Sequence, residues 1–261
     1  MAYRTAWMIG SYPALPAQSV TFDGSAQSVA TDDYYLYSST AGLSLLAQVV
    51  AAMTAASVAA PTCYIAKNRK VRLTSSGLFT VTWTSTLLRN LLGFSGNLAG
   101  NTSYTATSVS PLLWSPARQE SSMLTPLGIR GHVEHLSRQS VSPYTGRTET
   151  ISHGSREFQR FWFPHVTTER VRTSTDAGGT WANWFENVAV RGARWYLYRN
   201  VSEDLSSSVA ADLSGQALGP YIYSAKGKGV SWVFARAKGL ERSEVAADID
   251  VPCHVCPEYD S

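Results

Sequence analysis

The sequence predicts a mostly β protein of the α+β class, built from antiparallel sheets or a sandwich with two or three short packed helices. Charged residues make up only 16% of the 261 positions, and aromatic residues make up 11%. This balance favours short strands, turns and subunit contacts. Residues 78–83 alternate apolar and polar side chains, as a half-buried strand does. Apolar residues at helical spacing occur only over short stretches.

Residues 1–116 are expected to form an N-terminal β/α module. An extended, proline-containing arm leads to an edge strand at residues 20–22. Further strands are expected at residues 32–37, 63–65, 71–73 and 78–83, and a polar, turn-rich loop at residues 96–110. On the last of these strands, Phe79, Val81 and Trp83 share the inward face.

Two helices are expected within this module. The first is expected at residues 43–57. Capping residues precede it at 38–40, and Pro61 prevents the helix from continuing. Its core stripe contains Leu43, Leu46, Val50 and Met53. The second begins after the capping residue Ser85, and Gly93 stops it in a left-handed turn over which Phe94 folds back. Its core face contains Leu87, Leu88, Leu91 and Leu92.

Residues 117–261 are expected to form a second, aromatic-rich β domain, with the boundary near Pro116. Its expected strands are residues 129–135, 149–153, 156–163, 194–199, 220–223 and 230–236, with a hairpin turn at 226–229. One helix is expected between Thr180, which caps it, and Gly192, which closes it. Its buried face contains Trp181, Trp184, Phe185 and Val188.

The candidate interface residues are Trp195, Tyr196, Tyr198 and Trp232. On the strand at residues 194–199, Trp195 faces opposite to Tyr196 and Tyr198, so both faces carry large side chains. Such a strand is expected to be buried on both sides, either by a second sheet or by another subunit.

A Cys-x-x-Cys sequence near the end of the chain is the candidate metal site. Cys253 and Cys256 could bind zinc or an iron–sulfur cluster, but a complete site needs four ligands. The residues left to complete it are Cys63, His132, His135, His153 and His165. His132 and His135 belong to a strand and would face opposite ways, so they do not converge on one ion. The favoured alternative is a pair of reduced cysteines in a docked C-terminal tail, with no cofactor.

Several functional classes are disfavoured. The sequence contains neither Gly-x-Ser-x-Gly nor Gly-x-x-x-x-Gly-Lys, and no enzyme is expected. The net charge of +3 includes no basic stripe, so direct contact with nucleic acid is not expected. Its densest basic run, residues 67–72, fits a solvated hairpin. Residues 41–60 lack charge but are rich in alanine and polar residues, which favours a core helix over a membrane span.

The cysteine content and the first residues indicate the compartment. Three cysteines cannot all pair within one chain, which suits a reducing cytoplasm. Residues 1–10 lack the basic start and the apolar block of a signal peptide.

The order of elements over residues 34–116 resembles a known module. It runs from "YYLY" through "GLSLLAQVVAAM" and "KVRLTSSGLFTVTW" to "LLRNLLGFSGNLAGNTSYTATSVSPLLW". This order is similar to that of a module in minor structural proteins of tailed bacteriophages and other double-stranded DNA viruses. The resemblance implies a virion component assembled in the host cytoplasm, most simply in a tail tip, baseplate or connector. Its partners would be other virion proteins and copies of itself in a ring.

Two other functions are compatible with the residues. A minor capsid or decoration protein would bury β surfaces between subunits in the same way. A carbohydrate-binding or host-receptor-binding module would use exposed tryptophan and tyrosine rings, which also stack on sugars.

Overall fold

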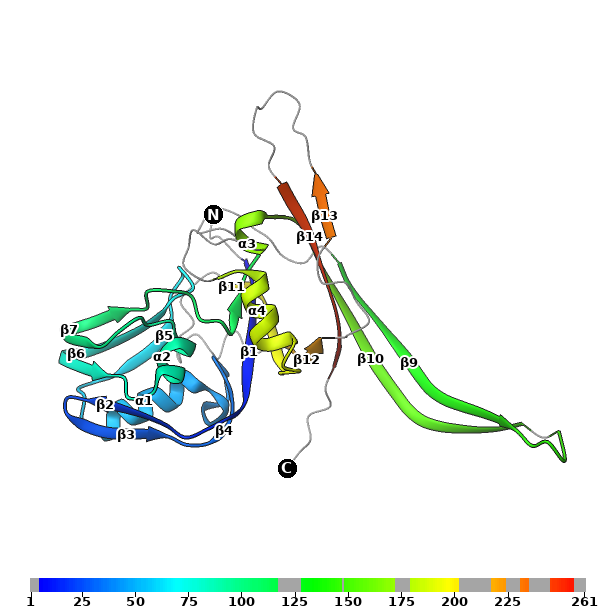
Figure 1. The fold of residues 1–261 in the computed structure, drawn as a ribbon, viewed down its shortest axis with the longest axis horizontal. Coiled ribbons are helices and arrows are strands. Elements are labelled where there is room, and N and C mark those ends of the chain that lie inside the picture. The colour runs from blue at the N-terminus through cyan, green and yellow to red at the C-terminus, as the bar shows by residue number, and fades with distance from the viewer. Residues whose placement is uncertain are drawn as a thin grey trace, which may run out of the picture.

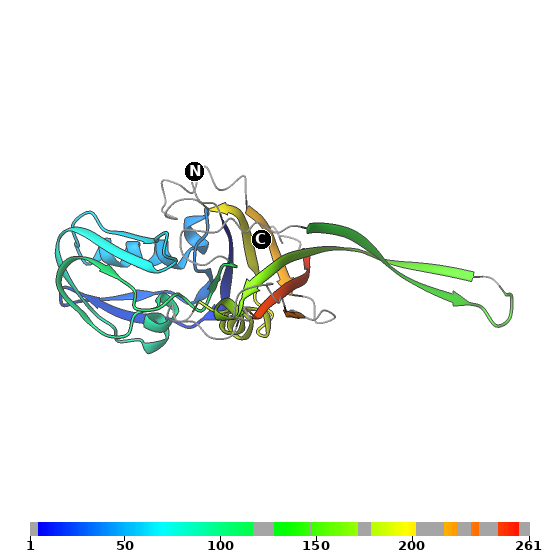
Figure 2. The ribbon, with the colours of Figure 1, turned by 90° about the horizontal axis from the view of Figure 1, so that it is seen from above.

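The computed structural model describes residues 5–116, 128–146, 148–171, 179–201, 217–223, 231–234 and 245–255. Within these residues strands dominate and form two antiparallel sheets with short helices packed on them, so the predicted mostly β, α+β class is confirmed. The molecule is elongated (Figures 1 and 2): a five-stranded sheet lies at one end, a nine-stranded sheet lies in the middle, and a two-stranded arm extends at the other end.

The five-stranded sheet has the order β3 (Ser25–Val29), β2 (Gln18–Phe22), β6 (Val71–Thr82), β5 (Thr62–Ile65), with β7 (Leu98–Thr105) also paired to β6. Two expectations were wrong here. β2 is not an edge strand, because it pairs with β3 along one side and with the end of β6 along the other. The polar stretch at residues 96–110 contains β7, which its pairing with β6 holds in place. The two strands expected at 71–73 and 78–83 form the single strand β6.

The first helix is α1 (Leu45–Ala55), preceded by the 3₁₀ turn η1 (Ala41–Leu43). Its cap is Ser44, whose hydroxyl accepts a hydrogen bond from the Ala47 amide at 3.4 Å, and not residues 38–40. Two residues of the expected core stripe were therefore wrong: Leu43 lies in η1 and is exposed, and Val50 is only half-buried. The buried face contains Leu45, Leu46, Val49, Ala52 and Met53.

The second helix, α2 (Thr86–Leu92), begins and ends as predicted. The Ser85 hydroxyl accepts a hydrogen bond from the Leu88 amide at 3.2 Å, and Gly93 has a left-handed φ of 82°. A Cβ atom at Gly93 would lie 2.2 Å from the carbonyl oxygen of Ser108, so glycine is required for this close approach. Phe94 folds back and stacks on Trp83, with ring centroids 5.3 Å apart.

The nine-stranded sheet has the order β4 (Asp32–Tyr35), β1 (Thr5–Leu15), β11 (Trp195–Val201), β12 (Ala217–Tyr223), β14 (Val245–Val255), β10 (Thr148–Thr167), β9 (Gly128–Val141). β8 (Leu113–Trp114) pairs with β1, and β13 (Ser231–Phe234) pairs with β14. This sheet combines strands from both sides of the boundary expected at Pro116. The expected N-terminal arm is instead β1, whose Trp7, Met8 and Ile9 are fully buried.

A short helical segment covers the nine-stranded sheet. α3 (Thr168–Val171) follows β10, and α4 (Trp181–Trp184) continues into the π-helical turn η2 (Phe185–Ala189). The Thr180 hydroxyl accepts a hydrogen bond from the Asn183 amide at 3.2 Å, which confirms the predicted cap. Trp181, Trp184 and Val188 are buried, as expected from their spacing.

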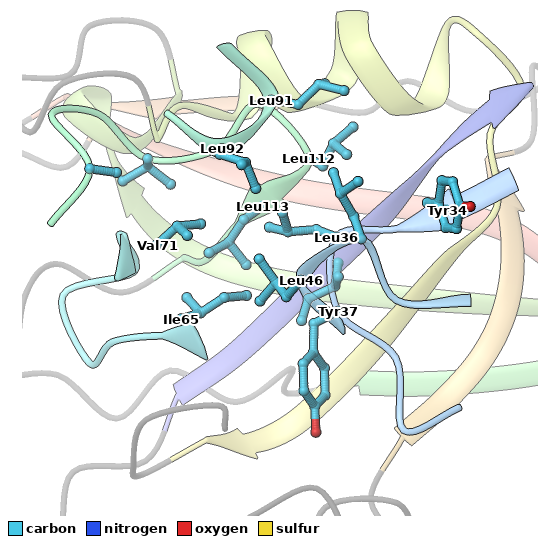
Figure 3. Close-up of a cluster of buried hydrophobic side chains, with 14 of the residues drawn as sticks. Tyr34, Leu36, Tyr37, Leu46, Ile65, Val71, Leu91, Leu92, Leu112 and Leu113 are labelled. Carbon is cyan, nitrogen blue, oxygen red and sulfur yellow. The ribbon is translucent and has the colours of Figure 1, made fainter. Parts of the chain in front are cut away.

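The two sheets share one continuous hydrophobic core. Figure 3 shows where they meet: Ile65 and Val71 of the smaller sheet gather with Leu46 of α1 and with Leu113 of β8. The ring of Tyr37 points away from this group. β8 belongs to the larger sheet, so the leucine side chains in this cluster join the smaller sheet to it.

Candidate functional site

The hairpin of β9 and β10 projects from the packed body of the molecule. Its outer part, residues 134–156, is called the arm. The paired residues run from Trp162 and Gly128 at the root to Thr148 and Val141 near the tip. Figures 1 and 2 both show this hairpin leaving the body and extending away from it. Arm residues on β10 pair only with β9 among the described strands, because pairing with β14 stops at Phe158.

Aromatic packing fixes the root of the hairpin. Phe161 and Phe163 of β10 are fully buried. The Phe161 ring contacts Trp195 and Tyr221, with centroids 5.9 and 5.1 Å away, and the Phe163 ring contacts Trp114 at 5.5 Å. Edge-to-face pairs of this kind add to the stabilisation from burial alone. The hairpin therefore starts from a well-packed base made by β8, β11 and β12.

An irregularity lies within the arm. Ser152 pairs with Ser137, whereas Ser155 pairs with His135, so β10 has one more residue than β9 in this interval. An extra residue of this kind is a β-bulge, which bends and twists a hairpin and disrupts pairing along that edge. The extra residue lies on β10 and not on β9, so β9 has the more regular free edge.

The tip of the arm is an ordered turn that exposes an aromatic ring. The Gly146 amide donates to the Ser142 carbonyl oxygen at 2.9 Å, and Gly146 has a φ of 65° that suits glycine. The Ser142 hydroxyl accepts a further hydrogen bond from the Thr145 amide. Tyr144 is 96% exposed and Val141 is 61% exposed. The turn thus presents two apolar groups on a defined backbone.

The predicted interface strand is β11, and the chain itself buries both of its faces. Trp195 is fully buried against Trp184 of α4, with ring centroids 5.5 Å apart. On the other face, Tyr198 is buried against Tyr37 at 6.0 Å, and the half-buried Tyr196 lies 4.7 Å from Tyr35. Burial on both sides, as expected, is therefore supplied within the chain by the elements around β11.

The fourth interface candidate, Trp232, lies on β13, where its register partner is Ala247 of β14. The placement of its side chain lies outside what the structure describes. Its role at an interface stays a prediction.

Cys253, the first residue of the Cys-x-x-Cys sequence, does not lie in a docked tail. Cys253 lies on β14 between two partner strands, opposite Gln159 of β10 and Tyr223 of β12, and the expectation of a tail at this position was wrong. Cys256 lies outside the described residues. His254 and His132 both pair with Phe158, from opposite sides, so β10 separates their backbones by roughly 10 Å at the usual strand spacing.

Of the residues that could complete a metal site, the structure describes the side chain of Cys63. Among the side chains that the structure describes, no group of three or more His, Cys, Asp or Glu could hold a metal ion, and the side chains of the four candidate histidines lie outside that set. Cys63 lies on β5 of the smaller sheet, and burial raises the pKa of its thiol, which disfavours the thiolate that binds metals. The metal site at Cys253 and Cys256 stays a prediction.

The basic run at residues 67–72 forms the predicted hairpin turn between β5 and β6. The expectation that this run is solvated was only partly right, because several of its cations contact the rest of the chain. The Lys70 ammonium donates to the Thr107 carbonyl oxygen at 2.8 Å, and the Arg72 side chain donates to the Ser103 hydroxyl at 2.9 Å. Arg69 is buried. These contacts tie the turn to the neighbouring chain segment.

Sequence reasoning missed the arm and its tip. It expected separate short strands at 129–135, 149–153 and 156–163, whereas β9 and β10 are much longer and paired throughout. A turn sequence, Ser-Pro-Tyr-Thr-Gly at residues 142–146, separates two polar segments of similar length. That symmetry could have indicated a hairpin without a core of its own.

Among the described residues, no helix has both the length and the apolar character needed to cross a membrane. The sequence matches no protein-family model, and it matches no curated protein at a significant level.

Proposed function

We propose that this chain is a non-enzymatic structural subunit of a virus particle, in the tail tip, baseplate or connector of a tailed bacteriophage. The observation that supports this role is the β9–β10 arm, which leaves the body from a well-packed aromatic root. In this proposal the subunit assembles in the host cytoplasm with copies of itself and with other virion proteins. The arm is the element that reaches the neighbouring subunit.

The physical argument concerns the stability of an isolated hairpin. A two-stranded hairpin in water is marginally stable at best, because it buries too little apolar surface to offset the ordering of its backbone. The arm pairs with nothing but itself among the described strands. Such a hairpin becomes more stable when another molecule covers it, as happens in strand addition and subunit assembly.

A second candidate function rests on Tyr144. An exposed tyrosine ring at the end of a projecting element suits contact with a host receptor or a carbohydrate. In that alternative the body would serve to hold the arm away from the particle surface, and glycan-array binding that disappears in Tyr144→Ala would favour it.

Mass spectrometry of purified particles and of tail-only fractions tests the first proposal. The expected result is the chain in both, at a fixed number of copies per particle. Recovery of the chain from capsids but not from tails would favour the minor capsid or decoration alternative. Absence of the chain from particles, with a strictly monomeric state in analytical ultracentrifugation at high concentration, would contradict the assembly role.

A further inference from the structure

We propose that the outer edge of β9 pairs antiparallel with the same edge of β9 in a second copy of this chain, about a two-fold axis at Leu136. The paired segment is residues 131–141 of both copies, most of which belong to the arm. The inference rests on the proposed assembly role and deepens it, because it names the partner, the contacting edge and the register. The two arms would then form one continuous antiparallel sheet.

The outer edge of β9 is an unpaired row of backbone hydrogen-bonding groups. β9 ends the strand order of the larger sheet, so none of the other described strands pairs with its second edge. In an antiparallel strand every second residue directs its N–H and C=O groups toward the same edge. Figures 1 and 2 show both strands of the arm extending clear of the two sheets. Such a row of donors and acceptors is a template for pairing with a strand of another molecule.

The composition of β9 favours pairing at this edge. Proteins usually protect a free edge with proline, lysine or a bulge. The sequence of β9, Gly128–Val141, contains neither proline nor lysine. The bulge of the arm lies on β10 between Ser152 and Ser155, so it interrupts the opposite edge. Of the two edges of the arm, the one on β9 is therefore suited to strand addition.

Antiparallel geometry limits the registers in which two identical edges can pair. Two partner residues either both direct their backbone groups toward each other or both direct them away. On two copies of one strand, the sequence numbers of two partners must therefore differ by an even number, and the two-fold axis passes through a residue. The contact is isologous, so each pair of unlike residues occurs twice across it.

The charges of β9 select among these registers. An axis at Leu136 places Glu134 of each copy opposite Arg138 of the other. An axis at Glu134 would instead place two acids opposite each other, and Arg130 opposite Arg138. Opposite charges in directly facing positions stabilise an antiparallel pair, and like charges destabilise it. Within one chain the register partner of Arg138 is the uncharged Ile151, so the second copy supplies the facing acid.

One other axis, at His132, would also oppose unlike charges, because it places Arg130 opposite Glu134. That axis lies at the root of the hairpin. His132 pairs with Phe158, the residue at which β10 also joins β14. Pairing there would bring the packed bodies of the two copies against each other, whereas the axis at Leu136 lies on the arm. The register centred on Leu136 therefore combines complementary charges with an edge that projects from the body.

Disulfide trapping at the axis tests the contact. In the full-length chain Leu136→Cys puts two thiols in directly facing positions, where Cα atoms lie about 4.5–5.5 Å apart and a disulfide can form. Mild oxidation with copper phenanthroline should give a covalent dimer whose linked peptides join position 136 of both copies. In the control Gln139→Cys the same positions would lie about 20 Å apart, and no such link should form. No link at position 136, or equal links in both variants, would overturn the inference.

Charge exchange gives an independent readout of the register. Glu134→Arg and Arg138→Glu each oppose like charges twice in the dimer, so each should raise the dimer dissociation constant in sedimentation about tenfold or more. A mixture of the two variants opposes unlike charges again, and mixed dimers should form about as tightly as those of the wild type. Each chain carries the same internal change alone and in the mixture, so a restored affinity reports the contact between copies. Unaffected single variants, or a mixture that fails to restore association, would contradict the register.

The outcomes separate this inference from the proposed function. If particles contain the chain but the Leu136→Cys variant forms no link between copies, the edge contact is wrong and the structural role stands. If the link forms and the mixed variants restore association but particles lack the chain, the pairing of the two edges stands and the virion role fails.

Discussion

The two halves of β10 belong to one strand but to different environments. The inner half, from Phe158 to Thr167, pairs with β14, and as far as Trp162 also with β9, and it buries Phe161, Phe163 and Val166. The outer half pairs with β9 alone and ends in a turn that exposes Tyr144. The inner half thus contributes to the stability of the fold, whereas the outer half projects beyond the body.

Substitutions in the two halves of β10 should therefore have different effects. Changes at the root should alter the free energy of unfolding of the whole chain, because root side chains belong to the shared core. Changes at the tip should alter association with a partner and leave unfolding nearly unaffected.

The largest effect is expected for Phe161→Ala. Removal of a fully buried ring that contacts Trp195 and Tyr221 should lower the free energy of unfolding by about 3–5 kcal/mol. Tyr144→Ala on the same hairpin is the control and should change it by less than about 0.5 kcal/mol. Urea denaturation followed by fluorescence measures both. Similar losses from the two variants would mean that the tip belongs to the folded core.

A smaller effect is expected where β1 approaches η2. A Cβ atom at Gly10 would lie 2.4 Å from the nearer methyl carbon of Val188, so Gly10→Ala should cost about 1–3 kcal/mol through overpacking. Val188→Ala removes both methyl carbons and should relieve the clash. In a double-mutant cycle the combined loss is expected to be smaller than the sum of the single losses. Simple additivity would contradict this packing of η2 on β1.

Local sequence rules found the caps of α2 and α4 but placed the cap of α1 too early. Ser85 and Thr180 cap their helices as predicted, and Gly93 ends α2, because each acts on residues within one turn of itself. The same rules missed β1 and β14. Each of these strands is held by partners far away in the sequence, such as Thr5 with Val201, and a single segment does not show its register partner.

For the candidate site too, the sequence predicted some features and missed others. The large residues on both faces of β11 predicted burial on two sides, and the chain provides it through α4 on one face and Tyr37 on the other. The sequence did not show that this burial would be internal. Nor could it single out Tyr144, because the exposure of a turn residue depends on where its hairpin points.

A pH-dependent effect of modest size is expected in the body. Burial raises the pKa of Tyr37 to about 12, and no described residue accepts a hydrogen bond from its hydroxyl. The folded chain therefore retains this proton where the unfolded chain, with an ordinary tyrosine pKa near 10, loses it. Its contribution to stability is fully present below about pH 10 and is lost as the pH rises toward 12.

Tyr37→Phe tests this assignment. The variant should be as stable as the wild type at neutral pH, or slightly more stable, since it removes a buried hydroxyl without a partner. As the pH rises from 10 to 12, the midpoint of its unfolding transition should fall less steeply than that of the wild type. An unchanged alkaline slope would show that Tyr37 does not titrate in the way that its burial implies.

The central claim is that the arm serves assembly and not the folding of its own chain, and a shortened hairpin tests it most directly. Glu134 and Arg156 are register partners, so residues 135–155 can be replaced by Asn-Gly, a two-residue turn suited to antiparallel strands. Unfolding and sedimentation of this variant are measured beside the wild type. The expected result is a free energy of unfolding within about 1 kcal/mol of the wild type and a loss of self-association. A loss of several kcal/mol, or association that persists without the arm, would contradict the claim.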